Sequence, residues 1–290
     1  MILAATRSDL LEALSSVRER GLRVGLVPTM GFLHEGHLSL LDIVRRETDF
    51  LAVSIFVNPL QFGPGEDLDR YPRDLERDLS LLEERGVDLV FHPSRQEMYP
   101  WGDPVVTVDP GPLGPRLCGE FRPGHFRGVL TVVARLFNLF RPRVAVFGQK
   151  DYQQAVLIRR MVRDLDLEVE VRLGPIVREA DGLAMSSRNV FLSLEERAHA
   201  AGIHRSLLRV QGAFEAGERS LGVLQRLLVR ELETHDLLKL QYGEIVHPES
   251  LEPLDPVGPG AVVAVAVHCG TTRLIDNVVL SGETHGSAPA

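Results

Sequence analysis

The stretch Val27-Pro-Thr-Met-Gly-Phe-Leu-His-Glu-Gly-His-Leu-Ser-Leu40 decides the fold of this chain. Before it, the apolar and β-branched run from Arg23 to Val27 is typical of a buried strand. After it, Leu38, Leu41 and Val44 recur at helical spacing. Two histidines therefore lie where a strand passes into a helix. The first turn of a helix carries unpaired backbone N–H groups and the positive end of the helix dipole, so this junction is suited to bind an anion.

Two glycines and two histidines make the turn a candidate phosphate site. Gly31 and Gly36 leave the backbone open to a phosphorylated ligand. His34 and His37 are three residues apart and share one face of the first helical turn, so both imidazoles can donate hydrogen bonds to a phosphoryl group. The alternative is that one or both histidines cap the helix or pack in the core. Zinc is a weaker alternative, because a third ligand is needed and no cysteine or H-E-x-x-H pattern lies nearby.

The composition predicts a sizeable core and excludes a general nucleic-acid binder. Of the 290 residues, 44% are hydrophobic and 25% charged, and the net charge is −8. The most apolar run, Val129–Phe140, is too short to span a bilayer, and the amino terminus lacks the features of a signal peptide. Cys118 and Cys269 are too few for a disulfide framework. We therefore expect a cytoplasmic protein with no membrane or nucleic-acid partner.

Polar residues follow two further strands. The apolar run Leu51–Val57 ends in Asn58-Pro-Leu-Gln61, and Val144–Phe147 ends in Gly148-Gln-Lys-Asp151. Lys150 is one of only two lysines among 32 basic residues, and a compact ammonium can follow a moving phosphate more easily than a rigid guanidinium. Because parallel strands end at one edge of a sheet, the histidine turn, Asn58/Gln61 and Gln149/Lys150 are expected to converge on a small-molecule site.

Strands that alternate with helices predict an α/β fold with a doubly wound parallel sheet. Within this part, Asp67–Arg85 is predicted to be an amphipathic surface helix and Pro110–Pro123 a loop. Beyond it, Met185-Ser-Ser-Arg188 offers two hydroxyls and a guanidinium in a loop that can close over a polyphosphate. The remainder predicts a smaller α+β domain, with helices at 194–216 and 219–236, antiparallel strands at 244–247, 261–268 and 273–280, and a disordered tail at 281–290.

Five segments, in order, resemble the pantothenate synthetase (pantoate–β-alanine ligase) family: Pro28–His37, Ser54–Phe62, Arg122–Phe126, Phe147–Gln154 and Val177–Asn189. H-x-G-H alone would also fit cytidylyltransferases and class I aminoacyl-tRNA synthetases, but the combination is far more specific. The resemblance implies a Rossmann-like sheet of the HIGH-motif nucleotidyltransferase type. It also implies an ATP- and pantoate-binding domain over residues 1–180 and a carboxyl-terminal lid domain over residues 181–290.

The resemblance further implies that ATP drives the condensation of (R)-pantoate with β-alanine to pantothenate, through a pantoyl adenylate, in coenzyme A biosynthesis. The implied catalytic residues are His37, His34, Lys150 and Arg188. The implied ATP contacts are Met30, Gly31, Phe32, Leu33, His34, Glu35, Gly36, His37, Gly148, Gln149, Lys150, Asp151, Val177, Met185, Ser186, Ser187 and Arg188. The implied substrate contacts are Gln61, Gln154, Asn58, Arg122 and Tyr71. Mg²⁺ is expected on the ATP phosphates near Asp78, with its protein ligands unassigned, and the family is typically a homodimer through the amino-terminal domain.

Two positions depart from the family pattern. Gln149 and Cys118 stand where the family commonly has glutamate, and we expect these changes to tune the activity rather than abolish it. Two other functions stay open from the sequence. One is a nucleotidylyltransferase that acts on a small phosphorylated substrate, and the other is a nucleotide-binding regulatory module without catalysis.

Overall fold

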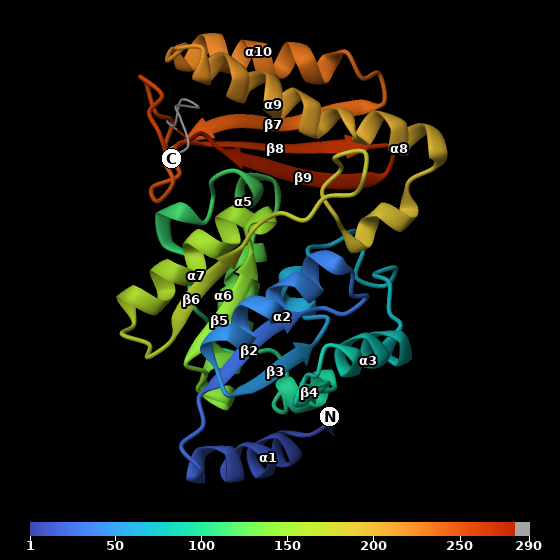
Figure 1. Ribbon diagram of the computed structural model, residues 1–290, viewed down its shortest axis with the longest axis vertical. Helices are drawn as coiled ribbons and strands as arrows, with labels where there is room; N and C mark the ends of the chain where they lie inside the picture. The colour runs from blue at the N-terminus through green and yellow to red at the C-terminus, as the bar shows by residue number, and fades with distance from the viewer. Residues whose placement is uncertain (282–290) are drawn as a thin grey trace, which may run out of the picture. The chain divides into compact units, whose positions relative to one another are not determined.

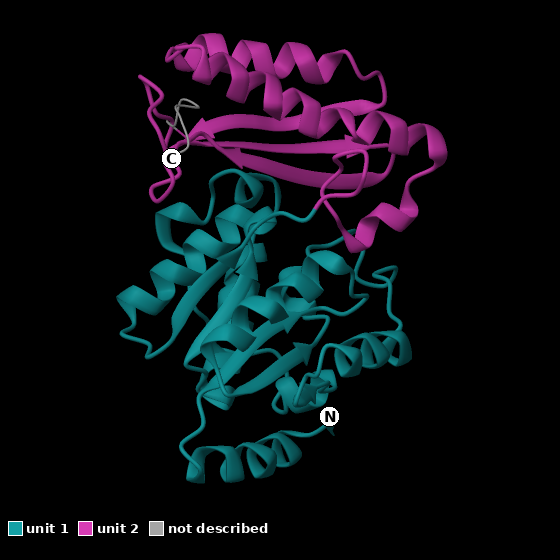
Figure 2. Cartoon of the chain, in the orientation of Figure 1, with its two compact units in different colours: residues 1–177 teal, residues 178–290 magenta. Residues whose placement is uncertain are grey.

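The computed structural model describes residues 1–281, and the chain divides into two compact units (Figure 2). Unit 1 is Met1–Val177, and unit 2 begins at Arg178. This division lies three residues before the boundary expected from the sequence. What each unit binds stays a prediction.

Unit 1 is built on a six-stranded parallel sheet (Figure 1). Every neighbouring pair of strands is parallel. The chain fills the sheet from β2 outward to β4 and later adds β5 on the other side of β2, so the order reverses between β2 and β5. This confirms the doubly wound α/β fold, and open sheets of this kind bind ligands where the order reverses. The strands lie in the order β1 (Ile2–Ala4), β4 (Leu89–Phe91), β3 (Phe50–Ile55), β2 (Val24–Thr29), β5 (Val144–Gly148) and β6 (Glu170–Gly174).

Helices cover both faces of this sheet. On one face, α2 (Glu35–Glu47) and α3 (Leu75–Glu84) pack in an apolar cluster that includes Val27 of β2. Successive side chains of a strand point to opposite faces, so the buried Leu26 points to the other face. There α6 (His125–Phe140) contacts β2 and also two further helices, α1 (Arg7–Glu19) and α7 (Tyr152–Asp164). The short elements between them are η1 (Pro59–Gln61), α4 (Arg95–Met98), η2 (Gly111–Leu113), α5 (Cys118–Phe121) and η3 (Gln149–Asp151).

Unit 2 is an α+β unit with its own core, as predicted. Its antiparallel sheet has the order β7 (Leu238–Val246), β8 (Val262–Cys269), β9 (Thr272–Val279). Buried leucine, valine and isoleucine side chains of this sheet pack against its helices in one cluster. Before the sheet come η4 (Ser187–Phe191), α8 (Leu194–Ala200), α9 (Gly202–Glu215) and α10 (Leu221–Glu233).

Several predicted boundaries are wrong, for local reasons. The helix expected over Asp67–Arg85 begins only at Leu75, because Pro72 disfavours helical geometry at the residue before it and the Asp74 side chain caps the helix by accepting from Arg77 N. The helix expected at 194–216 is in fact two helices, α8 and α9, separated at Ala201. The strand β7 begins six residues before the predicted start at Glu244. The segment 110–123, predicted to be a loop, contains the short helices η2 and α5. The strand β1 was not predicted. The disordered tail expected at 281–290 falls, apart from Ser281, outside the described residues.

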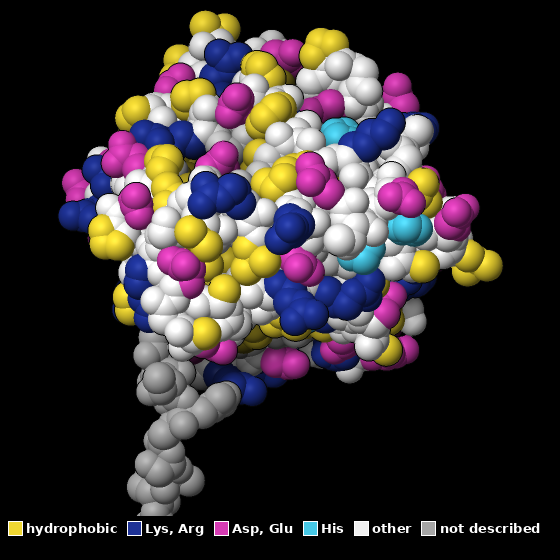
Figure 3. All heavy atoms as spheres, turned by 90° about the horizontal axis from the view of Figure 1, so that it is seen from above, with side chains coloured by type: hydrophobic (Ala, Val, Ile, Leu, Met, Phe, Trp, Pro, Cys, Tyr) yellow, Lys and Arg dark blue, Asp and Glu magenta, His cyan; other side chains and the backbone are white. Residues whose placement is uncertain are grey.

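On the face drawn in Figure 3, basic and acidic side chains are interspersed with apolar ones. Within residues 1–281, the longest apolar helix, α6, is a buried core helix, and none of the helices is long and apolar enough to cross a bilayer.

Candidate active site

The turn between β2 and α2 is fixed by a buried aspartate from α3. Asp78 Oδ2 accepts a hydrogen bond from Phe32 N and Oδ1 accepts one from Leu33 N, both at 2.7 Å. Gly31 and Phe32 adopt left-handed backbone geometry, with φ of 82° and 52°. A Cβ on Gly31 would also lie only 3.0 Å from Asp78 Oδ2. Burial outweighs these hydrogen bonds and raises the pKa of Asp78 above its ordinary value. The turn is therefore held in one conformation by a side chain that is distant in the sequence.

The two histidines cap α2 and stack on each other. His34 Nδ1 accepts from Gly36 N at 3.1 Å, and His37 Nδ1 accepts from His34 N at 3.4 Å, which forms a capping box made of imidazoles. Their ring centroids lie 4.1 Å apart. The helix-capping alternative is thus correct for both rings, but it uses only Nδ1. An Nδ1 that accepts leaves the proton of a neutral imidazole on Nε2, so each ring keeps an N–H donor at that atom.

Lys150 lies close enough to His37 to influence that ring electrostatically. It lies in η3, directly after β5, and β5 pairs with β2 in the sheet. Burial, then the electrostatic influence of His34 and Lys150, lowers the pKa of His37 well below its ordinary value. His37 is therefore a neutral imidazole at pH 7, with its N–H at Nε2. Unit 1 thus brings together three of the predicted catalytic residues.

The other predicted ATP contacts of unit 1 flank this group. Leu33 has a buried side chain, and its backbone N–H and carbonyl are hydrogen-bonded to Asp78 and Arg77, so it shapes the turn. Glu35 is exposed and pairs with Arg85 at 2.9 Å. Gly148 ends β5, and a Cβ there would meet nothing within 4 Å, so this position has room beside it. Gln149 and Asp151 lie with Lys150 in η3, and Val177 is the last residue of the unit.

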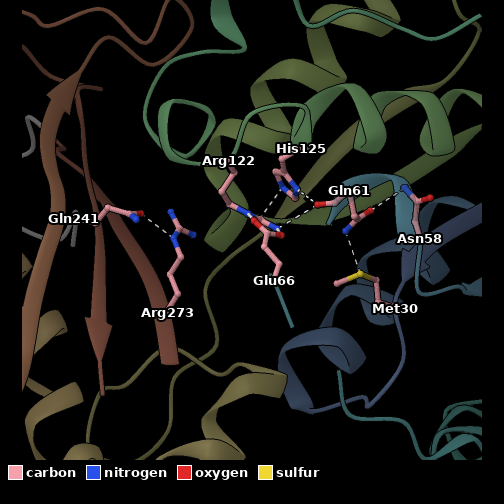
Figure 4. Close-up of polar contacts among 8 residues, drawn as sticks. All are labelled: Met30, Asn58, Gln61, Glu66, Arg122, His125, Gln241 and Arg273. Carbon is pink, nitrogen blue, oxygen red and sulfur yellow. Dashed lines mark hydrogen bonds and ion pairs between the residues drawn. The ribbon is translucent and has the colours of Figure 1, made fainter. Parts of the chain in front are cut away.

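Gln61 lies at the centre of a polar network at the end of β3 (Figure 4). Its Oε1 accepts from Asn58 Nδ2 at 3.2 Å, and its Nε2 donates to Met30 Sδ at 3.1 Å. Asn58 is only 1% exposed, and its remaining bonds go to Gly128 O, Leu60 N and Tyr99 Oη. All four hydrogen-bonding positions of the Asn58 amide are therefore filled. The structure makes Asn58 a support for Gln61 rather than an open contact.

Arg122 is engaged within the same network. Its guanidinium forms a two-pronged ion pair with Glu66, at 2.8 Å from Nε and 2.6 Å from Nη2. It also bonds to the ring of His125 and to the backbone carbonyl of Gln61. Burial works to raise the pKa of Glu66, but the hydrogen bonds and charge of Arg122 outweigh it and hold that pKa below its ordinary value.

The two other predicted substrate contacts differ in their surroundings. Tyr71 is buried and packs edge to face against Phe62, with ring centroids 6.2 Å apart. Gln154 is partly exposed on α7, and its side chain makes no hydrogen bond within the described residues. Its neighbour Gln153, which the sequence did not single out, is buried and donates to carbonyls of the 113–116 segment, so it ties α7 to that loop. An open amide such as Gln154 is suited to a small polar ligand.

The Met185–Arg188 segment belongs to unit 2 and is held in shape. Ser186 Oγ accepts from Arg188 N at 3.2 Å, so the segment opens the turn η4 instead of a featureless loop. Asn189 donates to Glu179 Oε1 at 2.7 Å, and Arg197 forms a fork with the same carboxylate. That these residues act on the same ATP molecule as the histidine turn stays a prediction.

A protein-bound metal does not fit the described residues. Within residues 1–281, no group of three or more histidine, cysteine, aspartate or glutamate side chains is arranged to hold a metal ion. Asp78, which was expected near Mg²⁺, directs its oxygens at two backbone amides. A cavity of about 390 Å³ lies beside the turn, lined by Met30, Gly31 and Phe32 with Asp69, Asp74 and Asp78 among others, but the two histidines, Gln61 and Lys150 are not part of its lining.

The residues that the sequence missed are those that support the site. Glu66 was not singled out, and Asp78 was named only as a neighbour of Mg²⁺ and not as the residue that holds the turn. Both lie in charged, surface-like segments, and their partners are more than 40 residues away, so no local pattern identifies these roles. Tyr99 donates to Asn58 across a similar separation. His125 stood in the quoted Arg122–Phe126 motif, which was the one available signal.

Comparison with known proteins agrees with this arrangement. The sequence model of the family described as Pantoate-beta-alanine ligase matches residues 3–279. The pantothenate synthetase of Thermoanaerobacter sp. (strain X514) is 53% identical over 279 residues, which cover 96% of this chain and 98% of that protein. The crystal structure of pantothenate synthetase from Thermus thermophilus has a TM-score of 0.90 at 50% identity, covering 97% of this chain and all of that one (100%). The pantoate-beta-alanine ligase of Francisella tularensis, solved in complex with beta-gamma ATP and beta-alanine, has a TM-score of 0.80 at 33% identity, covering 96% and 97%.

Proposed function

Because the chain belongs to the pantoate–β-alanine ligase family, we propose that it joins (R)-pantoate to β-alanine and converts ATP into AMP and pyrophosphate. It is an enzyme that forms a C–N bond. One observation carries the assignment to this site: the polar turns after β2, β3 and β5 bring His34/His37, Gln61 and Lys150 to the ends of three neighbouring parallel strands. Such an edge can hold a nucleotide beside a small acid.

The chemistry requires that the acid be activated first. A carboxylate is a poor acyl donor because oxide is a poor leaving group. A pantoate oxygen therefore attacks the α-phosphorus of ATP, the bond from that phosphorus to the bridging oxygen breaks, and pyrophosphate leaves. The product of this step is a mixed anhydride of pantoate and AMP.

The histidine turn and Lys150 stabilise this step. Negative charge builds up on the non-bridging oxygens of the α-phosphate as the new bond forms. His34 and His37, each a donor at Nε2, and the ammonium of Lys150 supply fixed hydrogen bonds and positive charge at that point. The family resemblance assigns Val177 and Met185–Arg188 to the same nucleotide.

Gln61 and Gln154 orient pantoate. Within the described residues, the contacts of Gln61 to Asn58 and Met30 leave one amide N–H and one carbonyl lone pair for a ligand. Gln154 offers its whole amide. Tyr71 is buried beside Phe62 and contributes shape rather than an assigned contact.

The second step forms the amide. The free amine of β-alanine attacks the acyl carbon, the bond to the AMP oxygen breaks, and the nitrogen loses a proton. No side chain of the described residues is assigned as the base. Exclusion of water protects the adenylate from hydrolysis, and positioning of the two reactants supplies much of the rate.

Mg²⁺ enters as the partner of the ATP phosphates. Because no protein site for the ion was found within residues 1–281, its ligands are expected to be phosphate oxygens and water, which is how Mg²⁺ commonly binds with nucleotides. None of the steps above is routed through the ion.

A homodimer through unit 1 is part of the proposal. Its support is an exposed apolar segment after α4, in which Trp101, Val105 and Val106 are 91%, 100% and 87% exposed. Contiguous exposed apolar side chains commonly mark a surface that a partner covers.

Because the reaction consumes ATP, we also propose that it takes place in the cytoplasm.

The test is to incubate the protein with ATP, Mg²⁺ and pantoate, with and without β-alanine. We expect pyrophosphate to exchange into ATP only when pantoate is present, and pantothenate and AMP to form only when β-alanine is added. Exchange that is independent of pantoate, or AMP transfer to a phosphorylated acceptor, would instead indicate a nucleotidylyltransferase. ATP binding without any AMP would indicate a regulatory module.

A further inference from the structure

The guanidinium of Arg122 is almost fully occupied by protein groups. Four of its five N–H donors are used: two in the fork to Glu66, one toward His125 Nε2 at 3.1 Å and one to Gln61 O at 3.3 Å. The Arg122 and Glu66 side chains are only 15% and 24% exposed. Because this bidentate ion pair is largely buried, water competes little with its hydrogen bonds, and both side chains are held firmly in place. Arg122 therefore has little capacity left to bind a substrate directly.

His125 completes the arrangement in one defined tautomer. Its Nδ1 lies 2.7 Å from Gln61 O, which can only accept, so Nδ1 carries the proton. Its Nε2 then accepts from Arg122 Nη1. Burial and the charge of Arg122 lower the pKa of His125 to about 4, which keeps the ring neutral as this pattern requires.

Arg122 and His125 both donate to the backbone carbonyl oxygen of Gln61. Gln61 is the last residue of η1, and the terminal carbonyls of a helical turn have no partner within the turn. Here the carbonyl of Gln61 accepts from Arg122 and His125, while its side chain is held by Asn58 and Met30 (Figure 4). The residue is thus fixed at its backbone and at its side chain by different groups.

We propose that Glu66, Arg122 and His125 form a positioning clamp that holds the Gln61 carbonyl and thereby aims its amide at pantoate. The clamp residues are positioning residues, since they act through Gln61. This proposal rests on the proposed function, in which Gln61 binds pantoate. It replaces the direct substrate contact that the family resemblance implied for Arg122.

The primary test is Glu66→Gln, assayed by steady-state kinetics with pantoate and ATP varied separately. The amide keeps the size of the carboxylate but turns an N–H toward the guanidinium, so the fork is broken. Because a small misplacement of a binding group is costly, we expect the KM for pantoate to rise about tenfold while the KM for ATP stays within about twofold. Glu47→Gln is the matched control, because Glu47 forms a comparable fork with Arg172 in the same unit, at 3.0–3.2 Å.

A double-mutant cycle separates positioning from general stability. In a Gln61→Ala background there is no amide to aim, so Glu66→Gln should add less than about a twofold effect on the KM for pantoate. A full tenfold effect in that background would overturn the clamp.

If Glu66→Gln fails to fold, His125→Leu removes one donor to the Gln61 carbonyl, whereas His125→Asn keeps an N–H at the δ position. The leucine variant should raise the KM for pantoate and the asparagine variant should largely restore it, and equal values for both overturn the proposal.

The wild-type protein in the same assay distinguishes failure of the proposed function from failure of the clamp. If it shows no pantoate-dependent turnover, the proposed function fails and the clamp fails with it. If the wild type is active and Glu66→Gln behaves like Glu47→Gln, only the clamp is overturned.

Discussion

At the scale of single residues, the two nitrogens of each histidine have different tasks in the proposed site. In His34 and His37, Nδ1 closes the capping box of α2, and in the proposed function Nε2 is the atom that donates to a phosphate. The sequence indicated both uses as alternatives, and spacing alone could not decide between them. The structure shows that they are compatible, because they need different atoms of one ring.

His37→Ala should lower turnover by about 10² or more with the fold intact, because it removes a donor from the point where charge develops. Steady-state kinetics measures the loss, and circular dichroism checks the fold. His37→Gln keeps an N–H near the Nε2 position and should recover part of the rate. Near-normal turnover of the alanine variant would refute the assigned role.

His125 makes folding stability depend on pH. Burial and the charge of Arg122 lower its pKa from 6.5 in the unfolded chain to about 4, so between these values the unfolded chain binds a proton that the folded chain does not. Stability therefore rises with pH through this window and falls as acid is added, by at most about 3 kcal/mol for this group. Urea unfolding at pH 7 and pH 4.5 measures the change. His125→Asn should show a smaller loss than the wild type, and an equal loss would contradict this assignment.

At the scale of elements, the strand ends were predictable and their supports were not. Apolar runs that end in polar residues identified β2, β3 and β5, and parallel pairing then dictates that their ends meet at one edge. Asp78 could not be identified in this way. It lies in a charged segment that reads as a solvated helix face, yet it is buried because the turn 31–33 covers it.

Asp78→Asn should loosen that turn. The amide can accept from only one of the two backbone N–H groups and presents its own N–H to the other, leaving a buried donor unsatisfied. We expect a loss of about 1–3 kcal/mol in the free energy of unfolding, together with a higher KM for ATP. Asp164→Asn is the control, since Asp164 forms an exposed pair with Arg160 on α7. Equal effects of the two substitutions would show that Asp78 does not hold the turn.

At the scale of the whole molecule, the acidic composition determines where positive charge for a phosphate can come from. With a net charge of −8, positive charge for a phosphate has to be gathered locally, and the proposed site draws on Lys150, two histidine donors and a helix amino terminus. The two-unit division follows the change from alternating strands and helices to an antiparallel sheet. The clamp on Gln61 could not be predicted, because Glu66 and Arg122 are 56 residues apart and only tertiary packing brings them together.

The exposed apolar segment provides a test of the homodimer. Val105→Asp places a charge on a side chain that is fully exposed in the single chain, so it should leave the fold unchanged. If this segment is the dimer surface, burying an unpaired charge there should shift the protein to monomer in sedimentation velocity. Val279→Asp is the control, at another exposed valine in unit 2. A variant at position 105 that sediments like the wild type would remove the support for this surface.

Isotope labelling tests whether the acid is activated through an adenylate, because it tracks a carboxylate oxygen of pantoate into AMP. Pantoate labelled with ¹⁸O in its carboxylate is incubated with the protein, ATP, Mg²⁺ and β-alanine, and the AMP is analysed by mass spectrometry. Attack of pantoate on the α-phosphorus predicts one ¹⁸O in each AMP, because the acyl–oxygen bond breaks when the amide forms. AMP without the label would contradict activation of the acid through an adenylate.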